Sequence, residues 1–243
     1  RSLAGAHEDH HVQVLRFTGV GESDFHAKLD KELMTIPDLE VGYCARTREI
    51  DLRLIGSKKS TQQASQLALS TFPGMCFSQN GESLEEIVVK LLNQQGKTIS
   101  IAESCTGGLI AHRITNVPGA SEVFTHGFVS YSNPAKQQLL GVSATTLEQH
   151  GAVSEAVAIQ MAEGALANAQ ADIAVSVTGI AGPGGGSEHK PVGTVLIGIA
   201  TATRSKAIKK FTPYGREIFK QATSQDALNL ARRTLEESGN ETC

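Results

Sequence analysis

The first part of the chain combines short runs that alternate apolar and polar residues with segments whose apolar residues follow helical spacing. Alternation is typical of strands that bury one face, and a spacing of three or four residues is typical of amphipathic helices. The pattern therefore predicts a small α+β module over residues 12–80. Its strands are expected at 12–17, 40–44 and 49–55, and its helices at 23–33 and 61–69.

From residue 82 onward, the sequence patterns that predict helices and strands are stronger. Ser83 and Glu86 form a capping box, after which an apolar stripe continues to Gly96. Near-continuous apolar runs at 172–177 and 192–200 predict strands that are buried on both faces. We expect an α/β sandwich with a mixed sheet over residues 82–240. Its other elements are expected as strands at 97–102, 124–129 and 206–212, the last in a hairpin with 192–200, and as helices from 109, after Ser154, and at 217–237.

The turn between the strand at 97–102 and the helix from Leu109 reads Ala-Glu-Ser-Cys-Thr-Gly-Gly. Ser104 lies near the expected helix N-terminus, where free N–H groups and the helix dipole favour an anion or a developing oxyanion. Gly107 and Gly108 would let a ligand approach the backbone closely. Because Ser and Thr before a helix are also ordinary N-caps, this segment alone leaves a structural role open.

A second segment, Tyr131-Ser-Asn-Pro-Ala-Lys136, supplies a phenol and an amine directly after a predicted strand. A serine nucleophile needs a base, and lysine can act as one when partial burial lowers its pKa from about 10.4 towards neutrality. A solvated surface lysine and a half-buried tyrosine with a wet hydroxyl are the structural alternatives.

The third segment holds five glycines between Gly179 and Gly186. Such a loop can cradle a phosphate with its N–H groups. It is not a Walker A loop, because no Gly-Lys-Ser/Thr ends it, and not a dinucleotide fingerprint, because a strand follows it where a helix is required. Taken alone, the pattern favours a flexible loop over a site.

Together these three segments resemble the C-terminal domain of the CinA family, whose stand-alone bacterial members are nicotinamide mononucleotide deamidases. The similarity runs from about Glu82 to Glu237. The preceding part, with Gly19-Val-Gly-Glu-Ser23 and Ile50-Asp-Leu-Arg-Leu54, resembles the small KH-like domain of full-length CinA proteins. The matching segments are AESCTGG at 102–108, PGAS at 118–121, GFVSYSNPAK at 127–136, LGV at 140–142, GAVSEAVA at 151–158, TGIAGPGGGSEHKPVGTV at 178–195 and the region of Arg216.

The resemblance implies an amidohydrolase of pyridine-nucleotide salvage that converts nicotinamide mononucleotide to nicotinate mononucleotide and ammonia, with no cofactor and no metal. Ser104 is then the nucleophile, Lys136 its base and Tyr131 a relay or second donor, with backbone N–H groups of 105–108 at the oxyanion. Water would hydrolyse the acyl-enzyme. Direct attack by water and attack by Cys105 are the alternatives. The residues expected to bind substrate are Glu103, Thr106, Gly107, Gly108, Asn133, Thr178, Gly179, Gly182, Lys190 and Arg216.

The region of Arg216 departs from the family pattern. Gly215 stands where an aspartate is usual, and Phe219 and Lys220 replace a commoner basic pair. The glycine loop, Lys190 and Arg216 are expected at the substrate phosphate, but these departures leave open how tightly the phosphate binds and which subunit supplies the arginine. A surface cation is the alternative role for Arg216.

Composition agrees with a soluble, cytoplasmic protein, at 40% hydrophobic and 19% charged residues. No apolar run approaches the roughly 20 residues of a membrane span. The net charge of −3 gives no bulk attraction to nucleic acid or to anionic membranes. The four cysteines, at 44, 76, 105 and 243, form no CxxC pair and are expected to be reduced.

The chain begins at Arg1, without a methionine, which indicates a piece of a longer protein. Residues 1–11 are expected to be a disordered terminus or linker remnant, and the cluster His7-Glu-Asp-His10-His11 is not expected to hold a metal. Full-length family members carry a further domain that resembles molybdopterin-binding proteins and is associated with ADP-ribose pyrophosphatase activity. Nothing in this chain matches that domain, so we expect its activity to be absent here. The resemblance also implies a homodimer or larger assembly.

Two other functions compete with the deamidase. A nucleotide-binding regulatory module could keep the pocket without effective turnover, as the departures at Gly215 and Phe219 would allow. A nucleic-acid-associated accessory protein is suggested by the competence and damage context of the family. The negative net charge and the absence of a GxxG loop from the KH-like module make nucleic-acid binding the weaker prediction.

Overall fold

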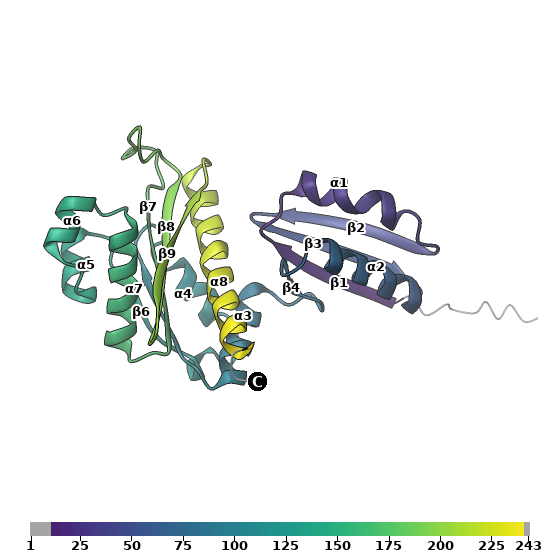
Figure 1. Cartoon of the computed structure of the whole chain (residues 1–243), viewed down its shortest axis with the longest axis horizontal. Helices are drawn as coiled ribbons and strands as arrows, with labels where there is room; N and C mark the ends of the chain where they lie inside the picture. Colours follow the sequence, from purple (N-terminus) through teal and green to yellow (C-terminus); the bar gives the residue numbers. More distant parts are fainter. Residues whose placement is uncertain (1–10, 241–243) are drawn as a thin grey trace, which may run out of the picture. The chain divides into compact units, whose positions relative to one another are not determined.

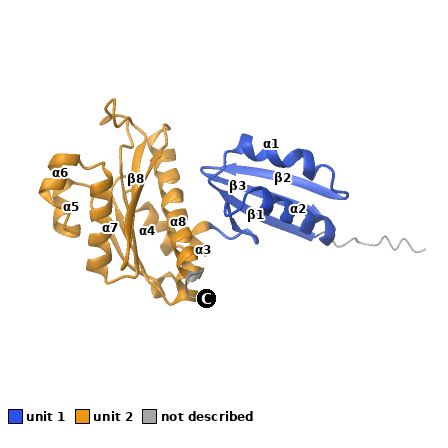
Figure 2. Ribbon diagram, in the orientation of Figure 1, with its two compact units in different colours: residues 1–83 blue, residues 84–243 orange. Residues whose placement is uncertain are grey.

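The computed structural model describes residues 11–240. The chain divides into two compact units, one that ends at Ser83 and one that begins at Leu84 (Figure 2). Residues 1–10 of the terminus predicted to be disordered, with the histidines at 7 and 10, lie outside the described residues. The prediction is wrong for His11, which begins a strand. His11 is described, and its Nδ1 atom is hydrogen-bonded to Thr61 Oγ1 at 2.8 Å.

The first unit is a four-stranded antiparallel sheet in the order β2-β3-β1-β4 with two helices against one face (Figure 1). Its core contains the stacked rings of Phe25 and Phe72, 4.8 Å apart, with Phe17 edge-on to Phe25. The predicted α+β module is confirmed. The three-residue strand β4 escaped prediction because it is too short to show alternation. The elements are β1 (His11–Thr18), α1 (Glu22–Leu33), β2 (Leu39–Arg46), β3 (Glu49–Gly56), α2 (Lys58–Thr71) and β4 (Cys76–Ser78).

The second unit is an α/β sandwich around a five-stranded sheet in the order β6-β5-β7-β8-β9. β5 runs parallel to β6 and β7, whereas β7, β8 and β9 are antiparallel, so the predicted mixed sheet is confirmed. Helix α7 lies on one side of the sheet and α8 on the other (Figure 1). The elements are α3 (Leu84–Gln95), β5 (Ile99–Glu103), α4 (Leu109–Thr115), the 3-10 turn Ala120–Glu122, β6 (Phe124–Val129), α5 (Asn133–Leu140), α6 (Ala144–His150), α7 (Glu155–Ala169), β7 (Ile173–Gly179), β8 (Thr194–Thr201), β9 (Ser205–Phe211) and α8 (Arg216–Asn240).

The hairpin of β8 and β9 and the burial of β7 and β8 on both faces agree with the sequence pattern. Ser154 caps α7, as predicted, because its side chain accepts a hydrogen bond from Val157 N. The strand predicted from Lys97 begins two residues later, at Ile99. Thr98 is instead tied to Asp172, whose Oδ2 accepts hydrogen bonds from Thr98 N at 2.8 Å and Thr98 Oγ1 at 2.9 Å.

Close packing of α7 on the sheet depends on a glycine in β8. A Cβ atom at Gly198 would come within 2.3 Å of the Ala158 carbonyl oxygen. The same oxygen accepts a hydrogen bond from Ser176 Oγ of β7, which joins the helix to the neighbouring strand. These contacts hold α7 close against β7 and β8. Among residues 11–240, no helix has the length and apolar content needed to cross a membrane.

Candidate active site

The predicted catalytic segments meet where the parallel strands end. Ser104 follows β5, and its N–H donates to Val177 O of β7 at 3.1 Å. Ser130 follows β6, and its N–H donates to Glu103 O at 2.8 Å. The backbone N–H groups of both serines therefore continue the hydrogen bonding between strands by one residue beyond the strand ends. The carboxyl ends of parallel strands are the usual place for ligand sites in open α/β sheets.

A buried Ser–Lys pair lies at this edge. Lys136 Nζ donates to Ser104 Oγ at 3.0 Å and to the Ser130 carbonyl oxygen at 2.9 Å. Lys136 is the fourth residue of α5, a helix that Ser132 caps by accepting a hydrogen bond from Ala135 N. The lysine is 1% exposed, so the solvated-lysine alternative does not describe it.

The surroundings of Lys136 make its neutral form easier to reach than that of a solvated lysine. Burial lowers the pKa of its amine, because an ammonium loses its hydration there, and only the neighbouring Cys105 acts in the opposite direction. Within residues 11–240, no carboxylate forms an ion pair with this amine. A neutral amine 3.0 Å from a hydroxyl can accept the hydroxyl proton, which is what a general base must do.

Cys105 is the rival nucleophile by position, and the structure favours Ser104 over it. Burial, with a smaller contribution from the charge of Glu103, raises the pKa of the Cys105 thiol to about 12. The thiolate is the reactive form of cysteine, so a thiol with this pKa is a poor nucleophile near neutral pH. Cys105 lines the pocket, but with 4% exposure it is mostly packed in the core.

Glu103 is the last residue of β5, and its side chain is turned to the start of α4 and does not line the pocket. Its carboxylate accepts hydrogen bonds from Gly108 N, Ile110 N and Ala111 N at 3.0, 3.1 and 2.8 Å. The expectation that it binds substrate is therefore not supported, because a side chain 1% exposed and bonded to three N–H groups has no free face. The anion that the helix N-terminus was predicted to attract is supplied by the protein itself.

Of the backbone N–H groups of residues 105–108 that were expected at the oxyanion, two are already bonded within the protein. The N–H of Gly107 donates to Ser104 O, and that of Gly108 donates to Glu103. Within the described part of the chain, the N–H groups of Cys105 and Thr106 donate to no oxygen of another residue. They are the remaining candidates for an oxyanion site beside Ser104.

Substitution of Glu103 should mainly affect stability. Glu103→Ala would leave three buried donors unpaired, and we expect it to lower the free energy of unfolding by about 3 to 5 kcal/mol. Glu103→Gln keeps the shape and one strong acceptor and should lose about half as much. Urea denaturation monitored by circular dichroism measures both. Equal stability of all three proteins would show that the carboxylate contributes nothing to the helix start.

Around the pair lies a pocket of about 210 Å³. Predicted site residues Asn133, Thr178, Gly179, Tyr131 and Arg216 line it together with Ser104 and Lys136. The predicted residues Thr106, Gly107, Gly108, Gly182 and Lys190 do not line it.

Tyr131 and Arg216 form a bonded pair at the mouth of this pocket. Arg216 donates to the phenol oxygen of Tyr131 at 2.7 Å and to the carbonyl oxygen of Gly182 at 3.3 Å. The phenol, 59% exposed, is thus held by the arginine, and no hydrogen bond joins it to Ser104 or Lys136 within residues 11–240. Arg216 comes from the first turn of α8, so this chain places its own arginine at its own pocket.

The glycine loop contributes less to the pocket than predicted. Gly182 offers a carbonyl to Arg216, where a phosphate would need an N–H, and Lys190 Nζ donates to His150 O at 2.8 Å. Gly179 is required by packing, because a Cβ atom there would lie 2.8 Å from Thr194 O and 3.0 Å from the Phe219 ring. Phe219, one of the departures from the family pattern, is a fully buried core residue under the loop.

Sequence reasoning missed Ala152, Val153 and Ala181, which also line the pocket. Thr178 Oγ1 donates to Ala152 O at 2.8 Å and so holds the 152–153 segment in place. These apolar residues carry no chemical signal of their own. The only indication was their place in the GAVSEAVA and TGIAG segments of the resemblance.

No cluster of three or more potential metal ligands occurs within residues 11–240. None of the described cysteines, at 44, 76 and 105, forms a disulfide within residues 11–240, and Cys243 lies outside the described residues.

Fold and site together define a two-unit α/β protein with a KH-like module and a buried Ser–Lys pair at the carboxyl edge of a mixed sheet. Comparison with known families gives the same result. The model of the CinA C-terminal domain matches residues 81–235, and that of the damage-inducible protein CinA KH domain matches residues 12–71. This chain belongs to the CinA family.

Relatives and solved structures agree with this assignment. A CinA-like protein of Akkermansia muciniphila is 46% identical over 219 residues, which cover 90% of this chain and 53% of the relative. The crystal structure of a competence/damage inducible protein from Agrobacterium tumefaciens is 42% identical, covers 63% of this chain and 93% of its own, and has a TM-score of 0.61. A CinA superfamily protein from Klebsiella pneumoniae gives 32% identity, coverage of 63% and 96%, and the same TM-score. The chain spans about half the length of the curated relatives it matches.

Proposed function

We propose that this chain is an amidohydrolase that converts nicotinamide mononucleotide to nicotinate mononucleotide and ammonia. The observation that carries the proposal is the buried hydrogen bond of 3.0 Å between Lys136 Nζ and Ser104 Oγ, with no carboxylate paired to the amine in the described residues. A neutral lysine beside a serine is a nucleophile–base pair for acyl transfer. Membership of the CinA family supports this class of reaction.

In the proposed reaction, Ser104 Oγ attacks the carboxamide carbon while Lys136 Nζ takes the hydroxyl proton. The oxyanion that forms would accept hydrogen bonds from Cys105 N and Thr106 N. The C–N bond then breaks, and the proton on Lys136 passes to the departing nitrogen, which releases ammonia. Water, deprotonated by the same amine, hydrolyses the ester and restores Ser104.

The size of the pocket supports a substrate that is only partly enclosed. A volume of about 210 Å³ is below the roughly 300–1,000 Å³ typical of pockets that enclose a drug-sized ligand. The nicotinamide ring would fill the pocket beside Ser104, and the ribose 5′-phosphate would extend to the mouth. Arg216, exposed there, can donate a bidentate pair of hydrogen bonds to a phosphate.

A regulatory module without turnover is the second candidate. It was suggested by the departures at Gly215 and Phe219, but Phe219 packs in the core and the Ser104–Lys136 pair is intact. The nucleic-acid alternative gains no support from the first unit. On its open sheet face, Arg46 contacts Asp51 at 2.8 Å and Glu49 at 3.2 Å, so this cation is already paired. The homo-oligomer and the cytoplasmic location stay predictions.

The proposal is tested by incubating the chain with nicotinamide mononucleotide in EDTA and measuring ammonia release and nicotinate mononucleotide formation. Stoichiometric formation of both products is expected. Free nicotinamide is the matched control, because it keeps the carboxamide and lacks the phosphate. Binding of the mononucleotide without ammonia release would favour the regulatory module over the enzyme. If the chain neither binds the mononucleotide nor releases ammonia, the proposed substrate is wrong.

Arg216→Met should weaken substrate binding more than it slows the chemical step. Removing a charge-assisted contact to a phosphate is expected to raise KM about 10- to 100-fold, with a smaller change in kcat. Steady-state kinetics with nicotinamide mononucleotide measure both constants. Arg233→Met, at an exposed arginine later in α8, is the matched control and should leave KM unchanged. An unchanged KM in Arg216→Met would remove the arginine from the phosphate site.

A further inference from the structure

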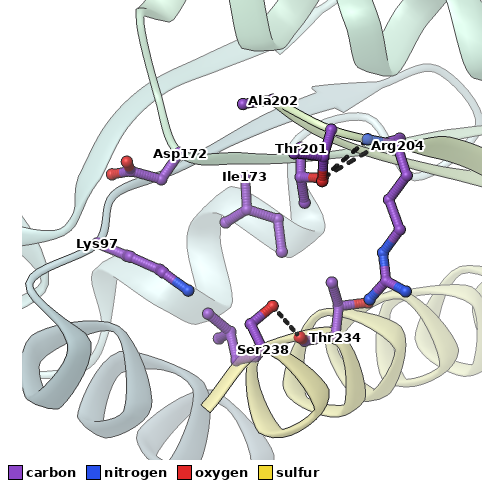
Figure 3. A pocket seen from close by; sticks show the side chains of 10 residues that line it. Lys97, Asp172, Ile173, Thr201, Ala202, Arg204, Thr234 and Ser238 are labelled. Carbon is purple, nitrogen blue, oxygen red and sulfur yellow. Dashed lines mark hydrogen bonds between the residues drawn. The ribbon is translucent and has the colours of Figure 1, made fainter. Parts of the chain in front are cut away.

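A second pocket, of about 390 Å³, lies at the opposite end of the same sheet. Figure 3 shows the side chains that line it. Ile173, which lines it, is the first residue of β7, whereas Thr178 and Gly179 at the other end of that strand line the pocket around Ser104. The turn between β8 and β9 and the last turns of α8 complete the second pocket. Its volume is within the range of pockets that bind small molecules.

One polar side chain in this pocket is buried without a partner. Thr234 is 2% exposed, lines the pocket, and its Oγ1 has no hydrogen-bond partner in the described part of the chain. Buried hydroxyls in native proteins are nearly always satisfied, by protein, water or a bound group. The oxygen atom is itself buried behind the pocket surface, so the Thr234 side chain would have to rotate to present its hydroxyl to a ligand oxygen.

Two cations converge on the same region. Lys97 extends into the pocket towards Thr234 and Ser238 (Figure 3) and, among residues 11–240, pairs with no carboxylate. Arg204 reaches towards Thr234 and holds Glu237 at 2.9 Å. Asp172 also lines the pocket, and its Oδ2 atom accepts two hydrogen bonds from Thr98. An ammonium and a guanidinium from two separate segments thus face one space, with the buried Thr234 hydroxyl beside it.

Ile173 and the buried Leu235 supply an apolar wall beside these donors. We propose that this pocket binds a small phosphate monoester with an apolar group. Its phosphate would lie among Lys97, Arg204 and Thr234, and its apolar group would contact Ile173 and Leu235. A phosphate offers three terminal acceptor oxygens for donors that come from three directions, which a planar carboxylate matches less well.

Phenyl phosphate is the probe, titrated calorimetrically into the full chain that carries Arg216→Met, so that binding near Ser104 is weakened. Hydrogen–deuterium exchange then locates the site, and protection is expected in residues 201–204 and 234–238. Lys97→Gln and Thr234→Val should each weaken binding about tenfold. Valine keeps the shape of threonine, and thermal unfolding verifies that both variants fold.

Lys210→Gln, at an exposed lysine of β9, is the matched control and should bind with unchanged affinity. Benzoate and inorganic phosphate separate the two halves of the probe, and both are expected to bind more weakly than phenyl phosphate. Protection confined to the Ser104 pocket, or affinity that survives both substitutions, would overturn the site. Benzoate binding as tightly as phenyl phosphate would overturn the assignment to phosphate. None of these readouts depends on turnover of nicotinamide mononucleotide.

Discussion

Ser104→Ala is expected to lower kcat for ammonia release from nicotinamide mononucleotide by about 10³-fold or more. Without the hydroxyl, the amide carbon meets no nucleophile of the protein, and the residual rate comes from binding and oxyanion stabilisation alone. KM should change little, because Ser104 contributes chemistry more than affinity. Initial rates of ammonia release over a range of substrate concentrations give both constants.

Cys105→Ala is the matched control for the nucleophile, one residue away on the same turn. Because the Cys105 thiol has a pKa raised to about 12 by burial, its removal should change kcat by less than about tenfold. Mass spectrometry of acid-quenched parent protein should also find the nicotinoyl ester on the peptide that contains Ser104. Turnover that survives Ser104→Ala but not Cys105→Ala would reverse the assignment, and survival in both would indicate direct attack by water.

Lys136→Met is expected to lower kcat by about 10³-fold, because methionine fills the buried space but accepts no proton. The parent should also show a characteristic pH dependence. Its rate rises with pH as the buried amine loses its proton, and the midpoint lies below the usual lysine pKa of about 10.4, since burial lowers this pKa. In Lys136→Met, the residual rate should lose that rise. The pH dependence of kcat from pH 5 to 10 measures it.

Stability supplies an independent readout for the same substitution. Between the lowered pKa of folded Lys136 and the usual value of about 10.4, the unfolded chain binds more protons than the folded one. The free energy of unfolding of the parent should therefore rise with pH across this window, and the rise should be smaller in Lys136→Met. Lys210→Met, at an exposed position, should behave as the parent does. Identical pH dependence of stability in the parent and in Lys136→Met would show that the amine is not perturbed.

The sequence predicted the meeting of Ser104 and Lys136 although 32 residues separate them along the chain. Both follow strands of a parallel pair, and parallel strands bring the segments after them to one edge of the sheet. Glu103 shows where this reasoning fails. Neighbouring residues at the end of a strand point to opposite faces of the sheet. The position of Glu103 next to Ser104 in the sequence therefore does not place its side chain in the same pocket.

Other features escaped prediction from the sequence for different physical reasons. Helices α5 and α6 are only 8 and 7 residues long, so their apolar periodicity is too brief to read, although Ser132 and Ser143 cap them. Lys190 was expected at the phosphate because it follows the glycine loop. Its ammonium instead donates to the carbonyl of His150, a contact between segments 40 residues apart that only the tertiary fold brings together.

Anchoring on both sides of Ser104 has a consequence for the temperature dependence of catalysis. The N–H of the serine is bonded to Val177 O, and the turn that follows is tied to the side chain of Glu103. The positional entropy of the nucleophile is therefore lost when the chain folds, and little remains to be lost in each turnover. The activation entropy of acylation should accordingly be small, and Glu103→Gln should make it more negative.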